Sequence, residues 1–340
     1  MPGKIAIPLL ITVNFICPCS AADSDFRFLA VGDVPYSQEQ YGQFLRLLSQ
    51  SKSEDFAFLM HIGDFKDGGT ECSDTALEKI AHVFQSYPKP IVYTPGDNEW
   101  TDCHRTGDDP IERLQKLREL FFQNPDTLRL SQLKVEHQNR NPQFKAYIEN
   151  YRFVKSNVLF IATHLVGSNN NYRPDHPPSM EEFNRRNRAN LAFMKESFAR
   201  AIEQKVSAVV VMIHANPDFE MGNSQGFKDF LLAMRRFLTK YHRPVICIHG
   251  DSHYFRIDKP LVDNKGLSYL HFTRVEDFGW PNVAGLSISV NPTSAEVFTY
   301  HPYYLSRRRI ASKRNGPVGV FCRLFTLHGV FLFDPIMCDF

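Results

Sequence analysis

Four aspartates stand directly after a glycine where an apolar run ends. The pairs are Gly32-Asp33, Gly63-Asp64, Gly96-Asp97 and Gly250-Asp251. Glycine lets the backbone turn sharply as it leaves a strand, and the carboxyl ends of parallel strands meet at one edge of a sheet, where α/β proteins bind ligands. Carboxylates gathered there repel one another unless a cation holds them. The sequence therefore predicts a metal site at the strand ends.

Histidines occupy similar positions. His214 follows the apolar run 209–212, and His249 and His253 flank Asp251. Carboxylate and imidazole ligands without thiolate suit Mn, Fe, Zn or Mg, and the sequence does not choose among these metals. The chain has no Cys-x-x-Cys pair, which argues against a zinc-thiolate site.

The elements that would carry these residues follow from the apolar pattern. Short apolar runs alternate with segments of helical period, as in α/β domains with a buried sheet. Strands are expected at 26–31, 56–62, 91–94, 158–163, 208–213 and 245–249. Helices are expected at 39–49, 74–87, 110–122, 180–204 and 225–240. Short strands in 267–300 suggest an antiparallel piece that closes the same sheet system, so one domain should span residues 24–305.

Composition supports a globular chain. Of the 340 residues 43% are hydrophobic and 22% are charged, which excludes a coiled coil and wholesale disorder. The formal net charge of +2 gives no basic field, so no specific nucleic-acid binding is predicted.

The N-terminus has the layout of a secretory signal peptide over residues 1–22. Lys4 precedes the apolar stretch 5–17, and small residues precede Asp23. The stretch is shorter than a membrane span, so the protein is expected to be secreted or extracytoplasmic. In an oxidising compartment, Cys72 and Cys103 are the best candidates for a disulfide.

The C-terminal extension, residues 306–340, has a basic run followed by an apolar segment. Arg323, His328 and Asp334 interrupt that segment, which makes it a poor membrane span. No role is assigned to the extension.

The order of these motifs resembles the calcineurin-like metallophosphoesterases over residues 26–256. The matching blocks are Asp33, Gly-Asp-Phe-Lys-Asp at 63–67, Gly-Asp-Asn-Glu at 96–99, His214 and His-Gly-Asp-Ser-His at 249–253. The resemblance implies a four-layer α/β/β/α sandwich with two mixed β-sheets. It also implies two divalent metal ions and a bridging hydroxide that attacks phosphorus in line.

The same resemblance implies a ligand set. Asp33 and His253 would bind the first metal, and Asp64 would bridge both. Asp97, where the family has asparagine, and His214 would bind the second metal. Asp251 replaces the first histidine of the family's last motif, with His249 as a possible substitute ligand. Side chains two apart on a strand point the same way, so both would face the site only if the strand continued through Gly250.

Two other departures concern catalysis. The family's Asp-x-His motif is Asp33-Val34-Pro35 here, so one imidazole ligand is missing. Tyr36 comes next and could coordinate as a phenolate, as a tyrosine of a later motif does in purple acid phosphatases. Asn98 stands where the family's histidine protonates the leaving group, and an amide is no general acid. The proton would then come from His104 or His164, or the substrate would need a good leaving group.

These residues define the expected function. A site rich in carboxylates needs positive groups to bind a phosphate, and Arg105, Arg173 and Arg256 lie in suitable segments. We expect a secreted metal-dependent phosphoesterase that hydrolyses a phosphomonoester or phosphodiester, either a small molecule or a nucleotide. The alternative is a secreted binding module that keeps the fold and a partial metal site without turnover.

Overall fold

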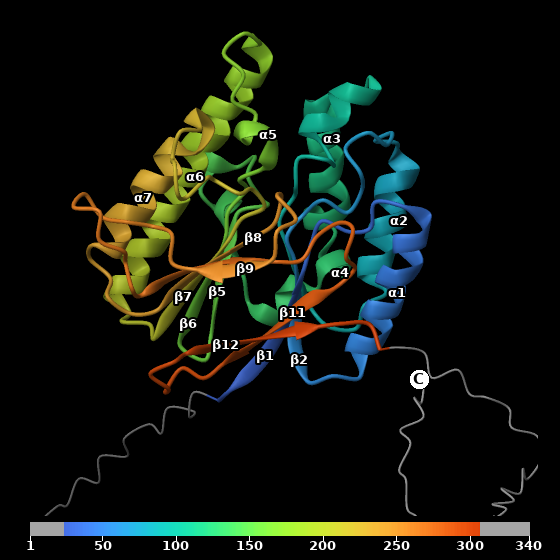
Figure 1. Ribbon diagram of the computed structural model, residues 1–340. Coiled ribbons are helices and arrows are strands. Elements are labelled where there is room, and N and C mark those ends of the chain that lie inside the picture. The colour runs from blue at the N-terminus through green and yellow to red at the C-terminus, as the bar shows by residue number, and fades with distance from the viewer. Residues whose placement is uncertain (1–23, 307–340) are drawn as a thin grey trace, which may run out of the picture. The chain divides into compact units, whose positions relative to one another are not determined.

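The computed structural model of the protein describes residues 24–306. The expected signal peptide and, apart from Ser306, the C-terminal extension lie outside this range. Within it, two β-sheets pack against each other and helices cover their outer faces (Figure 1). This arrangement is the four-layer α/β/β/α sandwich with two mixed sheets that the sequence motifs imply.

The first sheet has five strands in the order β12-β11-β1-β2-β3. Strands β1 to β3 are parallel, whereas β11 and β12 are antiparallel to their neighbours. Their bounds are β1 Phe26–Val31, β2 Phe56–His61, β3 Ile91–Tyr93, β11 Gly285–Val290 and β12 Phe298–Tyr303. The register pairs Val31 with His61 and His61 with Tyr93, so β1, β2 and β3 end level with one another.

The second sheet has seven strands in the order β4-β5-β6-β7-β8-β10-β9. Strands β6, β7, β8 and β10 are parallel, and β4, β5 and β9 run antiparallel at the edges. The bounds are β4 Glu136–His137, β5 Tyr151–Lys155, β6 Val158–Ala162, β7 Ala208–Met212, β8 Val245–His249, β9 Arg256–Asp258 and β10 Phe272–Glu276.

Helices close the sandwich on both sides. In Figure 1, α1 and α2 flank the first sheet, and α6 and α7 flank the second. The α-helices are α1 Gln38–Lys52, α2 Asp74–Gln85, α3 Pro110–Leu117, α4 Pro125–Leu128, α5 Gly167–Asn170, α6 Pro177–Glu203 and α7 Lys228–Leu238. Asp109 caps α3 and accepts from the Ile111 amide, with Pro110 in the first turn, where its missing N–H costs nothing.

The core follows the two-residue period of the strands. In β7, Val210 and Met212 face the cluster between the sheets, while Val209 and Val211 face the cluster under α6 and α7. Aromatic rings join the sheets: Phe58 of β2 lies with its ring centroid 5.4 Å from that of Phe160 in β6. Both faces of these strands are therefore buried, which explains their almost continuous apolar sequences.

The expected strands all occur, and four of them end one residue earlier than expected. The C-terminal strands differ from the expectation. We expected a purely antiparallel closing piece, but β10 is parallel to β8 in the second sheet, and only β11 and β12 join the first sheet. Strands β4, β5 and β9 were not anticipated, because they are short or carry charged residues.

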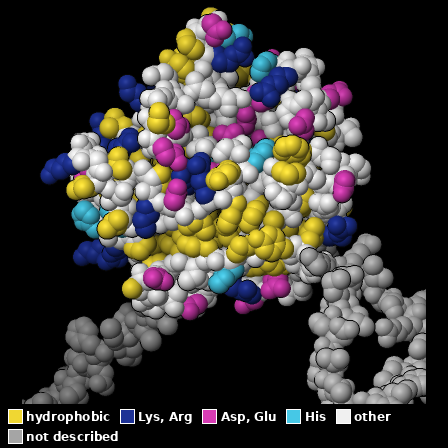
Figure 2. Space-filling view, viewed as in Figure 1, with side chains coloured by type: hydrophobic (Ala, Val, Ile, Leu, Met, Phe, Trp, Pro, Cys, Tyr) yellow, Lys and Arg dark blue, Asp and Glu magenta, His cyan; other side chains and the backbone are white. Residues whose placement is uncertain are grey.

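Hydrophobic side chains gather on the face between β9 and β12 (Figure 2). They line a groove where the edges of the two sheets approach, formed in part by Val245, Ile257, Val297 and Phe298. Among the described residues, no helix combines the length and apolar character needed to cross a bilayer.

Candidate metal centre

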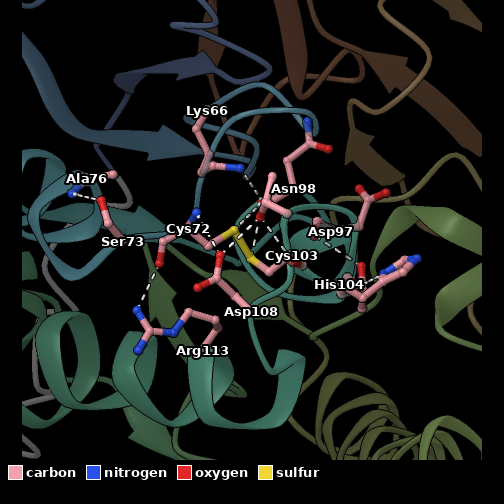
Figure 3. The surroundings of a disulfide bond; sticks show 12 residues. Lys66, Cys72, Ser73, Ala76, Asp97, Asn98, Cys103, His104, Asp108 and Arg113 are labelled. Atoms are coloured by element: carbon pink, nitrogen blue, oxygen red, sulfur yellow. Dashed lines mark hydrogen bonds between the residues drawn. A yellow bond between two sulfur atoms is a disulfide. The ribbon is translucent and has the colours of Figure 1, made fainter.

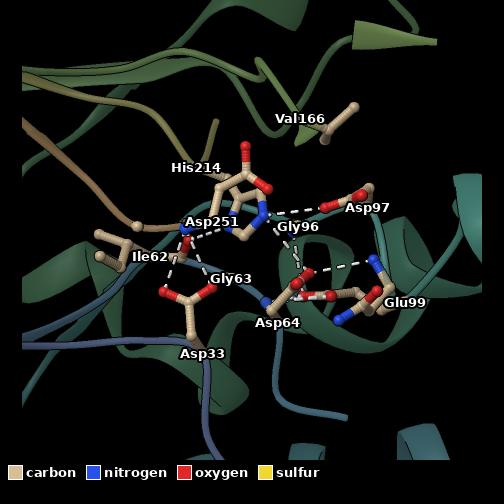
Figure 4. A network of polar contacts seen from close by, with 12 residues as sticks. Asp33, Ile62, Gly63, Asp64, Gly96, Asp97, Glu99, Val166, His214 and Asp251 are labelled. Atoms are coloured by element: carbon tan, nitrogen blue, oxygen red, sulfur yellow. Dashed lines mark hydrogen bonds and ion pairs between the residues drawn. The ribbon is translucent and has the colours of Figure 1, made fainter. Parts of the chain in front are cut away.

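The predicted ligands that follow strands meet at one end of the sandwich. Figure 4 shows Asp33, Asp64, Asp97, His214 and Asp251 side by side, and His253 Nε2 lies 3.6 Å from Asp33 Oδ1. Asp33, Asp64 and Asp97 follow β1, β2 and β3 of the first sheet, and the others follow β7 and β8 of the second: His214, Asp251 and His253. Ligand atoms of Asp33, Asp64 and His214 lie within 4.8 Å of one another, and so do those of Asp97, His214 and Asp251. The two groups share His214.

The backbone is strained at these positions. Asp33 and Asp64 both have φ of 54°, Asp251 has 75° and His253 has 59°. Left-handed φ is uncommon for residues with a Cβ and costs of order 1–3 kcal/mol each. Each such residue turns the chain abruptly where a strand has ended, which brings its side chain to the common centre.

Two of the preceding glycines are required by close packing. A Cβ on Gly96 would lie 2.0 Å from Oδ1 of Asp64, and one on Gly250 would lie 2.0 Å from Oδ2 of Asp33. Any larger residue would displace a carboxylate. The repeated Gly-Asp pair thus serves packing between neighbouring loops, as well as the turn that each loop makes.

Hydrogen bonds orient the ligands. The His214 Nδ1–H donates to the Ile62 carbonyl over 2.7 Å, which turns Nε2 toward Asp97 Oδ1 at 3.0 Å and Asp64 Oδ1 at 3.5 Å. The Glu99 carboxylate accepts from the amides of Asp64 and Gly96, each at 3.0 Å, and so holds two ligand loops together. Such outer partners fix the direction of metal ligands.

Electrostatics at the centre favour a bound cation. Burial, followed by the charges of Asp97 and Glu99, raises the pKa of Asp64 well above its ordinary value. Burial and Asp97 raise the pKa of Asp251 to about 7. Burial opposes a charged imidazole at His214, yet Asp64 and Asp97 raise its pKa well above the usual range. The buried carboxylates repel one another, and divalent cations would relieve that repulsion.

Tyr36 lies next to His253. It directly follows Asp33-Val34-Pro35, which lacks the imidazole ligand of the family's Asp-x-His motif. Its hydroxyl donates to Asp64 Oδ2 over 3.0 Å and lies 3.2 Å from His253 Nε2. The Asn98 amide donates to the same phenol oxygen over 3.1 Å. Asn98 therefore contacts Tyr36 and, through its backbone N–H, the Asp64 carboxylate at 3.0 Å.

Arg105 lies at the exposed edge of the centre. Its side chain is 51% exposed and pairs with the buried Asp102 at 2.8 Å. The Ser168 hydroxyl lies 2.8 Å from a carboxylate oxygen of Asp102 and 2.8 Å from one of Asp97, so it links Arg105's partner to the ligand set. A Cβ on Gly68 would meet both Asn98 Oδ1 at 2.5 Å and Arg105 Nη1 at 2.8 Å, which places the guanidinium beside the site.

His249 and Arg256 lie outside the centre. His249 is fully buried, with its ring centroid 5.8 Å from that of Phe219 and its Nε2 4.0 Å from Glu276 Oε2. The strand ends at His249, so the condition for His249 and Asp251 to share a face is not met. Arg256 donates to Glu276 over 2.6 Å and pairs with Glu220 at 3.3 Å, which commits its guanidinium to two carboxylates.

His164 is also placed away from solvent. It is fully buried and donates from Nδ1 to Glu149 over 3.0 Å, and its ring lies 5.4 Å from that of Trp100. Burial lowers the pKa of His164 to about 4, so the ring is neutral. We assign it a structural role. His104 is exposed, with Nδ1 bound to the Thr101 carbonyl at 2.7 Å.

The expected disulfide between Cys72 and Cys103 is present (Figure 3). It joins the loop after Asp64 to the 3₁₀ helix η1 Thr101–Thr106, which carries Asp102 and Arg105. Lys66 reinforces the same junction, because its ammonium donates to the Asn98 carbonyl over 2.9 Å. The two loops behind the metal centre are therefore covalently linked.

Sequence reasoning overlooked two neighbours of the ligands. A Cβ on Gly167 would lie 2.5 Å from Asp97 Oδ1 and 2.6 Å from Asp251 Oδ1, and the adjacent Ser168 contacts Asp97 directly. Both residues belong to α5, in the segment after β6, which contributes no aspartate or histidine to the predicted ligands. Only their position after a buried strand end could have drawn attention to them.

Comparisons with known proteins identify the family. The family model for calcineurin-like phosphoesterase matches residues 26–255. The chain therefore belongs to the calcineurin-like phosphoesterase family, which makes it a metal-dependent phosphoric ester hydrolase. The comparison with curated protein sequences found no match.

Two solved structures are similar to this chain at low sequence identity. A dimetal phosphatase from Danio rerio is 14% identical, with a TM-score of 0.51 over 83% of this chain and 99% of that one. A purple acid phosphatase from seeds of yellow lupin (Lupinus luteus) is 13% identical, with a TM-score of 0.45 over 82% of this chain and 53% of that one. The similarity to the dimetal phosphatase supports the fold described above.

Proposed function

We propose that the protein is an exported phosphoesterase that hydrolyses a phosphomonoester or phosphodiester with two divalent cations. The observation that carries the proposal is the convergence of four aspartates and His214 from both sheets in two overlapping groups of ligand atoms, with His253 Nε2 3.6 Å from Asp33 Oδ1. The donor set fits hard or borderline divalent cations, because it contains carboxylates and imidazoles and no thiolate.

Each ligand has a proposed assignment. Asp33 and His253 would hold one cation, His214, Asp97 and Asp251 the other, and Asp64 would contact both. When bound, two such cations supply charge neutralisation for phosphate and activation of water. His249 is left out of this set because its ring lies against Phe219 and Glu276.

The chain's own side chains would orient the substrate. Arg105 is exposed and held by Asp102, so it can donate to a phosphate oxygen. Tyr36 and Asn98 form a second polar edge beside Asp64 and His253. His164 is buried against Trp100 and Glu149, away from this edge, and cannot protonate a leaving group from its present position. Good leaving groups should therefore be preferred.

Turnover with metal content tests the proposal. Purified protein should contain two divalent ions per chain by mass spectrometry and should hydrolyse p-nitrophenyl phosphate or bis(p-nitrophenyl) phosphate with Mn²⁺, Fe²⁺, Zn²⁺ or Mg²⁺. Asp64→Asn should abolish hydrolysis and lower the metal content. Asp67→Asn is the matched control, because Asp67 stands in the same motif and its carboxylate accepts from the Gly69 amide rather than facing the proposed ligands. No turnover with any of these metals would refute the enzyme and favour the binding module.

Export has its own support and its own test. The N-terminal layout of residues 1–22 and the Cys72–Cys103 disulfide both suit an oxidising compartment. Expression of the full chain in a secreting host should yield a protein that begins near Asp23 outside the cytoplasm. Retention of residues 1–22 on a cytoplasmic product would contradict export.

A further inference from the structure

The segment 277–281, which follows β10, is anchored on the metal centre. The Asp277 amide donates to the His249 carbonyl over 2.9 Å, and the Trp280 amide donates to the Asp33 carbonyl over 3.1 Å. Gln40 of α1 donates to the Pro281 carbonyl over 3.1 Å. Hydrogen bonds thus hold both ends of the segment, and one of them is made to the backbone of Asp33, a predicted metal ligand.

Close packing fixes the segment against two ligand side chains. A Cβ on Gly279 would lie 2.7 Å from His253 Cδ2 and 2.8 Å from Asp33 Cβ. One residue earlier, Phe278 stacks on Phe255 with ring centroids 4.1 Å apart. Contacts with Asp33 and His253 therefore fix the backbone position of Trp280.

Trp280 nevertheless leaves half of its surface in solvent. Its side chain is 52% exposed, and its ring centroid lies 6.4 Å from that of His253. The other tryptophan, Trp100, is fully buried. Tyr254, directly after His253, is 67% exposed. A large aromatic ring held rigidly beside a ligand and left open to solvent suits contact with a planar group on the substrate.

We propose that Trp280 stacks on the base of a nucleotide, so that, among phosphate esters with comparable leaving groups, those of nucleosides are preferred. This inference rests on the proposed phosphoesterase function and narrows its substrate class. The indole lies beside His253, a proposed metal ligand, and so at a distance from the proposed cations. In a nucleotide the ribose likewise keeps the base at a distance from the phosphorus. Base stacking on an aromatic side chain contributes about 1–3 kcal/mol, or roughly 5- to 150-fold in affinity.

The test compares two esters with similar primary alcohol leaving groups. Wild-type protein should hydrolyse adenosine 5′-monophosphate with a kcat/KM about tenfold or more above that for ribose 5-phosphate. Trp280→Ala should lower kcat/KM for adenosine 5′-monophosphate about tenfold more than for ribose 5-phosphate, and Trp280→Phe should restore most of the difference. Tyr304→Ala is the matched control, because Tyr304 is an exposed aromatic that contacts Phe278 (ring centroids 5.8 Å apart).

Fluorescence provides a readout that needs no turnover. Adenosine should quench the emission of the exposed Trp280 in metal-loaded protein, ribose should not, and Trp280→Phe should remove the quenching. Equal kcat/KM values for the two esters, or equal losses for both in Trp280→Ala, would overturn the inference while leaving the phosphoesterase function intact. If no ester is hydrolysed, the proposed function fails, and absence of adenosine quenching would then overturn the stacking inference separately.

Discussion

The Tyr36 hydroxyl donates to Asp64 Oδ2 over 3.0 Å, although the two residues come from loops after different strands. The same oxygen contacts His253 Nε2 at 3.2 Å. A phenol therefore stands between a carboxylate proposed to contact both metals and an imidazole proposed to bind one of them.

Tyr36→Phe should weaken metal binding. Removal of the hydroxyl leaves Asp64 and His253 without a shared partner, and loss of such an outer contact costs about 10- to 100-fold in metal affinity. Calorimetric titration of metal-free protein with Mn²⁺ measures the change. The control is Tyr41→Phe on α1, where the ring contacts Lys79 of α2; this variant should bind Mn²⁺ like the wild type. Unchanged affinity in Tyr36→Phe would exclude Tyr36 from the centre.

Arg105→Ala should raise KM for a phosphate ester about tenfold, because a charge-assisted hydrogen bond to phosphate is lost. Asp102→Asn should produce a smaller rise, since the guanidinium remains but loses its partner at 2.8 Å. Steady-state kinetics on p-nitrophenyl phosphate measures both. Arg185→Ala on α6 is the control, because its guanidinium pairs with Glu181 on the surface of the same helix. A KM for Arg105→Ala equal to that of the control would remove Arg105 from substrate binding.

Replacement of both Cys72 and Cys103 by serine should destabilise the domain. The disulfide spans 31 residues, and the chain-entropy model gives about 3–4 kcal/mol for a loop of that size. Urea denaturation should show a lower midpoint for the double variant. Added reductant should lower the midpoint of the wild type and leave that of the variant in place. A urea midpoint of the wild type that stays the same with reductant would contradict a stabilising disulfide.

Acid should destabilise the fold through His164. Burial lowers its pKa to about 4, whereas the unfolded value is about 6.5. The unfolded chain then binds more protons between these values, so the free energy of unfolding falls as pH drops from 6.5 to 4, by about 3 kcal/mol from this group. His164→Gln cannot titrate and should lose correspondingly less stability over that interval in urea titrations. Parallel pH profiles for the two proteins would show that His164 is not the source.

Local sequence predicted the strand ends well, because glycine and a following aspartate reveal where a buried strand turns. Asp33, Asp64 and Asp97 could be placed in this way, and His214 could be placed by its position after the apolar run 209–212. The contribution of Tyr36 could not, since it depends on how the loop after Val34 folds over Asp64. The motif order suggested His249 as a ligand, yet the chain leaves the strand at Gly250 and Asp251 takes a left-handed turn.

Contacts between distant loops were the other gap. Trp280 is 247 positions beyond Asp33, and only the parallel pairing of β8 with β10 brings its loop to the same edge. Arg256 illustrates the reverse case: its position near the last motif suggested phosphate binding, whereas Glu276 and Glu220 occupy its guanidinium. Neither the pairing of β8 with β10 nor the ion pairs of Arg256 can be predicted from local sequence.

The proposed ligands are divided between the sheets: Asp33, Asp64 and Asp97 come from the first, and His214, Asp251 and His253 from the second. In addition to the phenylalanine-rich interface, a bound pair of cations would therefore hold the two sheets of the sandwich together. Any ion bound in this way favours the native state in proportion to its concentration over its dissociation constant. A shortage of metal would then destabilise the fold as well as stop catalysis, so the supply of metal ions would govern how long the folded protein persists.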